Sequence, residues 1–128
     1  VIKLLDIMNP LEETINELLQ KVENGLRKNH INTTVPHVAL DYQSLLTAYL
    51  STSFGLIERL DMLEAQYFVN NRKDNKSDNA TKRAWEITDE GIRQKFWQTR
   101  IKRINVLIDG LEKIYYQGRR DYEQKQLK

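Results

Sequence analysis

The sequence predicts an all-α fold, an elongated antiparallel three-helix bundle whose helices carry coiled-coil-like heptad stripes. Three observations support this prediction. Apolar residues recur in alternating steps of four and three, which keeps them on one side of a helix wound at 3.5 residues per turn. The 128 residues include only two prolines and five glycines, too few for a fold with many turns. Charged residues make up 30% of the chain and hydrophobic residues 40%, which suits long helices with one solvated face.

The first helix is expected over about residues 10–28. Asn9 is a good N-cap, and the ring of Pro10 presets the backbone angle of a first helical residue. Glu12 and Glu13 would then lie in the first turn, where the helix dipole favours negative charge.

Both ends of this helix carry a further signal. Asn29 follows the last apolar residue of the stripe and is a candidate left-handed cap. At the other end the stripe extends backwards through Met8 and Leu4. The sequence therefore leaves open whether residues 1–8 form a short extra N-terminal helix.

The second helix, expected over about residues 36–70, carries the clearest stripe. Its members follow one another in steps of four and three, and only the serine is clearly polar: Val35, Ala39, Tyr42, Leu46, Tyr49, Ser53, Leu56, Leu60, Leu63 and Tyr67. This helix has further apolar residues outside the stripe, so we expect it at the centre of the bundle, between two neighbours.

A polar loop separates the second helix from the third. Residues 70–81 are almost entirely polar or charged and predict a flexible, solvated loop. The third helix is expected over about residues 80–125. Its stripe again steps by four and three: Trp97, Ile101, Ile104, Ile108, Leu111, Tyr115, Gly118 and Tyr122.

A break is expected near residues 88–91, inside the third helix. The residues there are weak helix formers. Thr88 is a suitable N-cap for a new helix, with Asp89 and Glu90 in its first turn.

A difference in helix length predicts an exposed apolar end. The first helix is shorter than the other two, so it would leave the far end of the bundle as a two-helix hairpin. Two helices cannot bury several apolar stripes each, and exposed apolar surface of this kind marks partner sites. The predicted partner-binding residues are Leu56, Leu60, Leu63, Tyr67, Trp85, Ile92, Phe96 and Trp97. The alternative is that residues 1–8 fold back and cover this end.

The third helix also carries a basic face. It lies in a segment, residues 93–103, that contains no acidic residue, and its members are Arg93, Lys95, Arg100, Lys102 and Arg103. A basic face with aromatic neighbours can bind nucleic acid, anionic lipid or an acidic protein. The simpler interpretation is the solvated outer face of a bundle helix.

Several functional classes lack support. No nucleophile motif or glycine-rich phosphate loop is present, so we expect no enzymatic activity. His30 and His37 are the only histidines and imply no third ligand, so we expect no metal and no cofactor. The chain has no cysteine, no signal-peptide pattern and no transmembrane segment, and we expect an intracellular location, cytoplasmic or nuclear. It begins at Val1, and we expect it to be a single domain of a larger protein.

Together these observations predict a non-enzymatic protein–protein interaction module. It would act as a scaffold or adaptor subunit of a larger intracellular complex and bind a partner helix through its exposed apolar end. The partner is another protein or, through oligomerisation, a second copy of the chain. The alternative function is nucleic-acid or acidic-membrane binding through the basic face.

Overall fold

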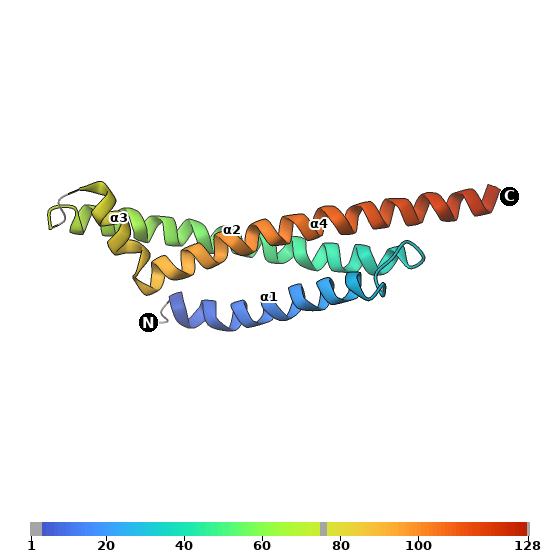
Figure 1. Ribbon diagram of the computed structural model, residues 1–128, viewed down its shortest axis with the longest axis horizontal. Helices are drawn as coiled ribbons and strands as arrows, with labels where there is room; N and C mark the ends of the chain where they lie inside the picture. The colour runs from blue at the N-terminus through green and yellow to red at the C-terminus, as the bar shows by residue number, and fades with distance from the viewer. Residues whose placement is uncertain (1–3, 75–76, 128) are drawn as a thin grey trace. The chain divides into compact units, whose positions relative to one another are not determined.

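The computed structural model describes residues 4–74 and 77–127 (Figure 1). These residues are 88% helical with no strand among them, in the order α1 (Leu4–Arg27), α2 (Pro36–Asn71), α3 (Asp78–Glu86) and α4 (Asp89–Leu127). The all-α prediction is confirmed. The predicted count of three helices is not confirmed: four helices are found, because the predicted third helix is divided into α3 and α4. Residues 1–3 of the possible N-terminal helix and residues 75–76 of the predicted loop lie outside the described residues.

The first helix begins earlier than predicted. It starts at Leu4 and Pro10 lies inside it, so the predicted start and the placement of Glu12 and Glu13 in the first turn are wrong. Proline supplies no N–H to the carbonyl one turn earlier, which costs stability. Met8 is fully buried, and this burial offsets that cost.

The end of α1 follows its local signals. Asn29 has a φ of 59°, which confirms the predicted left-handed cap. The His30 N–H donates to the Gly25 carbonyl over 2.8 Å and the Asn29 N–H donates to the Leu26 carbonyl over 3.2 Å, the two bonds of a Schellman motif. Ile31 then packs over Gly25, where a Cβ atom would lie only 2.7 Å from the Ile31 Cδ1 atom.

The chain packs as two compact units. Unit 1 comprises Val1–Leu50 and Arg103–Lys128, and unit 2 comprises Ser51–Lys102. In unit 1, α1 and the adjoining parts of α2 and α4 supply a mainly apolar core. Its buried members are Met8, Glu12, Ile15, Leu19, Val22, Ile31, Ala39, Leu46, Ile104, Leu107 and Leu111. Glu12 is the one buried charged residue in the described part of the chain.

A glycine brings the α1–α2 connection onto α4 within unit 1. Gly118 is buried, and a Cβ atom there would lie 2.6 Å from the Thr33 carbonyl oxygen and 2.8 Å from the Pro36 Cβ atom. The small residue that interrupts the predicted α4 stripe is therefore required for this close approach.

Unit 2 contains the second part of α2, all of α3 and the first part of α4. Ser77 caps α3, since its Oγ atom accepts a hydrogen bond from the Ala80 N–H over 3.1 Å. The buried side chains are Ser53, Leu56 and Leu60 from α2, Thr81 and Trp85 from α3, and Gln94 and Trp97 from α4. Unit 2 therefore has a smaller core than unit 1 and a larger polar share in it.

Candidate protein-interaction site

The eight predicted partner-binding residues all lie in unit 2, but only one of them is exposed. Leu56, Leu60, Trp85 and Trp97 are buried, Leu63, Tyr67 and Phe96 are half-buried, and Ile92 is exposed. The expectation of an exposed apolar hairpin is therefore wrong for the four buried residues. Partner binding by the other four stays a prediction.

The separate helix α3 explains part of this burial. The sequence predicted a break near residues 88–91 but counted the segments on both sides of it as one third helix. Instead α3 turns back, and the ring of Trp85 packs against the ring of Tyr67 with centroids 5.6 Å apart and planes tilted by 56°. Aromatic pairs prefer such tilted arrangements, so this contact stabilises the docked position of α3.

The α3–α4 junction forms where the sequence predicted a break, near residues 88–91. The Thr88 hydroxyl accepts a hydrogen bond from the Gly91 N–H over 3.0 Å and donates one to the Trp85 carbonyl over 2.6 Å. The first of these bonds confirms Thr88 as the N-cap of α4. A Cβ atom on Gly91 would overlap the Trp85 carbonyl oxygen, so the junction requires glycine there.

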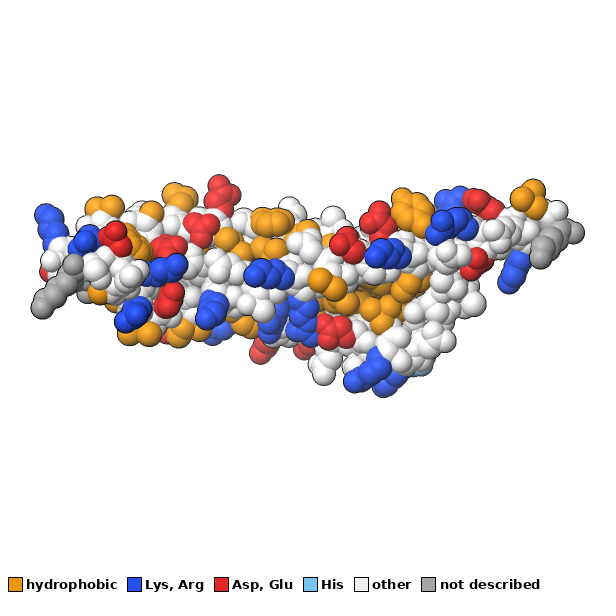
Figure 2. Space-filling model, turned by 45° about the horizontal axis from the view of Figure 1, so that its top comes forward, with side chains coloured by type: hydrophobic (Ala, Val, Ile, Leu, Met, Phe, Trp, Pro, Cys, Tyr) orange, Lys and Arg blue, Asp and Glu red, His pale blue; other side chains and the backbone are white. Residues whose placement is uncertain are grey.

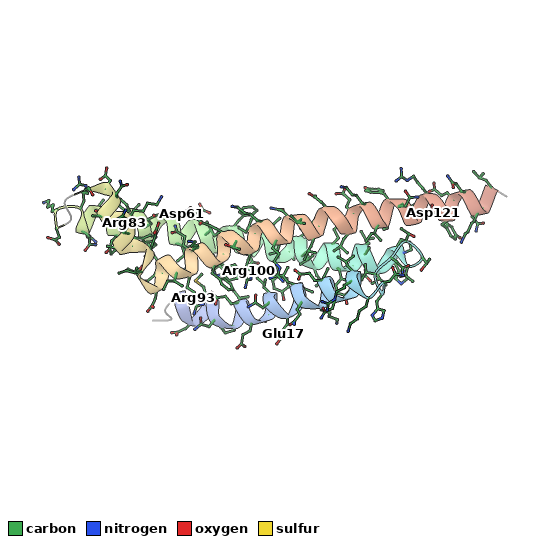
Figure 3. All side chains as sticks on the ribbon, in the orientation of Figure 1. Glu17, Asp61, Arg83, Arg93, Arg100 and Asp121 are labelled. Carbon is green, nitrogen blue, oxygen red and sulfur yellow. The ribbon has the colours of Figure 1, made fainter. Side chains whose placement is uncertain are left out.

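A partly buried polar network connects α3 and α4 to α2. The Trp85 Nε1–H donates to the Gln94 Oε1 atom over 2.7 Å. The Gln94 side-chain amide in turn donates to Asp61 Oδ1 over 2.8 Å and to Glu64 Oε1 over 3.1 Å; Figure 3 labels Asp61 on α2. One glutamine thus satisfies a buried indole and binds two carboxylates, which fixes the alignment of the three helices in unit 2.

An apolar row remains on the outside of α2 in unit 2, and we call it the α2 outer face. It consists of Phe54, Met62 and Val69, whose side chains are 53%, 61% and 77% exposed. Spacings of eight and seven residues keep all three on one side of a helix. Figure 2 shows hydrophobic side chains reaching the surface among charges of both signs.

The low number of charges on this side of α2 is a signal in the sequence for an apolar outer face. The intervening residues on the same side of the helix are Glu58, Asp61 and Ala65, so the face carries two charges, both negative, over four turns. Solvent-facing sides of helices normally carry several charges. The heptad stripe on the opposite side is stronger and dominates the apolar pattern of α2.

A cleft of about 240 Å³ lies between α2 and the α3–α4 junction, also within unit 2. Leu63 and Tyr67 line it from α2, and Trp85, Thr88 and Glu90 line it from the other side. Three of the predicted partner-binding residues therefore meet around one concave surface.

The predicted basic face is partly occupied by contacts within the chain. In unit 1 the Arg103 guanidinium donates to both carboxylate oxygens of Glu23, over 2.5 and 2.8 Å. This hydrogen bonding is the largest effect and raises the pKa of Arg103; burial opposes it, and the charge of Glu23 adds a smaller increase. In unit 2 the Arg100 guanidinium lies 4.1 Å from the centre of the Phe96 ring. The exposed members of the basic face are Lys95 and Lys102.

Outside the cleft in unit 2, the described residues include an open depression on unit 1. This depression of about 1050 Å³ is lined, apart from Thr33, by α4 alone, so it is the open surface of one helix. No group of three or more His, Cys, Asp or Glu residues among the described ones is arranged to hold a metal ion. No helix in the described part of the chain is long and apolar enough to cross a membrane.

Comparison with known proteins leaves the fold and these surfaces as the basis for assigning a function. No family model, curated protein or solved structure matches this chain. The class that the structure supports is an all-helical protein with a helical-bundle arrangement.

Proposed function

We propose that this chain is a non-enzymatic helical interaction module that binds another helix through the α2 outer face. The helix belongs to a second copy of the chain or to a different protein. The exposure of Phe54, Met62 and Val69 in one row is the observation that carries the proposal. Packing an apolar row of one helix against that of another is a common mode of recognition.

The size of the row indicates a weak interaction unless other contacts join it. Full burial of a large apolar side chain contributes about 1.5–3 kcal/mol. With 53%, 61% and 77% of the three side chains exposed, their burial would contribute roughly 3–6 kcal/mol. Association itself costs about 4–15 kcal/mol, so a stable complex needs further contacts beside this face.

The finer architectural predictions belong to the same proposal. Four members of the predicted α2 stripe that follow one another at seven-residue spacing are buried: Ala39, Leu46, Ser53 and Leu60. This spacing supports coiled-coil-like packing of the helices in an elongated antiparallel bundle. A long, stiff helical scaffold would hold the α2 outer face in a fixed position, which suits a subunit of a larger intracellular complex.

The test compares two variants of the chain in solution. Phe54→Lys with Met62→Lys places two charges on the α2 outer face, whereas Val106→Lys places a charge at a site in unit 1 that is 71% exposed and is the control. Molar mass from light scattering over a concentration series reports self-association, and a pull-down with each variant as bait reports other partners.

We expect association that the Phe54/Met62 variant loses and the Val106 variant keeps. Self-association with this pattern would assign a second copy as the partner. A monomeric chain with a bound protein that depends on Phe54 and Met62 would assign a different protein. The proposal would be contradicted if the chain were monomeric and if the unchanged chain, the Phe54/Met62 variant and the Val106 variant all bound the same proteins in the pull-down.

A further inference from the structure

The cleft between α2 and the α3–α4 junction has one charged residue in its lining. Glu90 is that residue, and no basic side chain lines the cleft. The Glu90 carboxylate makes no hydrogen bond or ion pair with any described residue, and Glu90 is half-buried. Such a carboxylate gains most from a cationic partner that brings its own hydrogen-bond donors.

The other walls suit a long side chain with a flat, polar end. Leu63, Tyr67 and Trp85 provide apolar and aromatic surface, and the Tyr67 ring is only half-buried. Gln66 and Asn70 line the cleft with side-chain amides, whose oxygens accept hydrogen bonds. The cleft thus combines an apolar wall, amide oxygens and one anion within about 240 Å³.

We propose that this cleft takes the guanidinium side chain of an arginine presented by the partner protein. Its methylene groups would pack on Leu63 and Tyr67, and its guanidinium would donate to the Glu90 carboxylate. The positive end of the α4 dipole offsets part of the charge of Glu90. Recognition therefore depends on directional hydrogen bonds and on ring stacking as much as on charge.

The same chemistry favours arginine over lysine. A guanidinium is planar, carries five N–H donors in a fork and stacks on aromatic rings, whereas an ammonium is a compact, strongly hydrated charge. Unit 2 already contains one such stack, between Arg100 and Phe96. The Tyr67 ring offers a second flat surface for the same contact.

This inference deepens the proposed function by naming a residue of the partner. The α2 outer face alone supports a weak complex, and an arginine anchored in a nearby cleft is the kind of contact that dominates many interfaces. It rests on the proposed function only in attributing the arginine to a partner protein. The experiment uses a free arginine derivative, so its failure would leave the test of the α2 outer face untouched.

The experiment follows the two indole N–H signals of the chain by NMR. Trp85 lines the cleft, while Trp97 is fully buried and does not line it, so Trp97 is the internal reference. The probes are Nα-acetyl-arginine methylamide, the lysine equivalent and the neutral citrulline equivalent. We expect a saturable shift of the Trp85 signal with arginine, a smaller effect with lysine and none with citrulline.

Two variants test the carboxylate. Glu90→Gln removes the charge in the cleft, and Asp89→Asn removes a charge from the same first turn of α4 at an exposed position that does not line it. Since hydrogen bonds to charged groups are strong, Glu90→Gln should weaken arginine binding by at least about tenfold, whereas Asp89→Asn should leave it nearly unchanged.

Three results would overturn the proposal. They are an unmoved Trp85 signal with arginine, an equal shift with citrulline or lysine, and an equal loss of binding in the Glu90 and Asp89 variants. Circular dichroism of both variants checks that their helix content is unchanged, so that a loss of binding reports on the cleft.

Discussion

Unit 1 and unit 2 bury different kinds of side chain. Glu12 is the one polar or charged side chain among the buried residues of unit 1, whereas unit 2 buries Ser53, Thr81 and Gln94 beside two leucines and two tryptophans. Apolar burial is non-directional, but buried polar groups require partners in fixed positions. Unit 1 is therefore stabilised by many interchangeable contacts, and unit 2 by a few that are directional.

Two of the glycines, Gly25 in unit 1 and Gly91 in unit 2, show the same difference, whereas Gly118 in unit 1 also meets backbone, at the Thr33 carbonyl oxygen. In unit 1, the atoms next to a Cβ on Gly25 would belong to the Ile31 side chain, which can move. In unit 2, the atoms next to a Cβ on Gly91 would belong to the backbone of Trp85 and Glu86, which cannot move without undoing the junction. Unit 2 thus depends on a single backbone geometry between α3 and α4.

The largest expected effect follows from that geometry. Gly91→Ala should lower the free energy of unfolding by more than about 2 kcal/mol, because the added carbon overlaps a backbone carbonyl and overpacking of this kind typically costs 1–3 kcal/mol. Gly25→Ala in unit 1 should cost less. Urea unfolding followed by circular dichroism measures both.

A third glycine provides the control for these substitutions. A Cβ atom on Gly55 has no neighbour within 4 Å, so Gly55→Ala should raise the free energy of unfolding by about 0.5–1 kcal/mol through the better helix propensity of alanine. If Gly91→Ala were as stable as the unchanged protein, the backbone of the α3–α4 junction could adjust to a side chain. Unit 2 would then not depend on a single backbone geometry there.

An intermediate effect is expected at the centre of the polar network. Gln94→Leu keeps most of the side-chain volume but leaves the buried Trp85 Nε1–H without its acceptor, which should cost about 1–3 kcal/mol. Gln98→Leu, one turn further along α4 and exposed, should change stability by less than about 0.5 kcal/mol. Equal stabilities of the two variants would show that the network contributes little to unit 2.

The smallest effect is expected at the ion pair in unit 1. Arg103→Lys replaces a bidentate contact with Glu23 by a single one and should cost less than about 1 kcal/mol, because both side chains are 39% exposed. Arg120→Lys, exposed and bonded to Gln117, is the matched control. A loss of several kcal/mol would mean that unit 1 also depends on directional contacts.

The pKa of Arg103 determines the pH dependence of this effect. Glu23 raises that pKa in the folded state, so the arginine's contribution is fully present below the pKa of the unfolded chain and is lost only as the pH rises through the still higher folded value. The stability contributed by the Arg103 charge should therefore stay constant between about pH 6 and pH 9, because both of these pH values lie far below the arginine pKa of the unfolded and the folded chain. Urea unfolding at several pH values measures this.

Local signals in the sequence determined where most helices begin and end. Helix α2 runs over Pro36–Asn71, against a prediction of about 36–70, because proline at its start and the polar segment after it act within a few residues. Asn29 and Thr88 act as caps for the same reason. Helix boundaries depend mainly on neighbouring residues, which a sequence displays directly.

Only the tertiary structure decided which apolar residues are covered. Burial of Met8 holds a helix across Pro10, and the return of α3 places Trp85 on Tyr67 and forms the cleft beside Glu90. These outcomes depend on the free energy gained when surfaces distant in the sequence meet, which no local spacing displays. The 3.5-residue stripes indicated which side chains are apolar candidates for burial, and the tertiary packing determined which of them are buried.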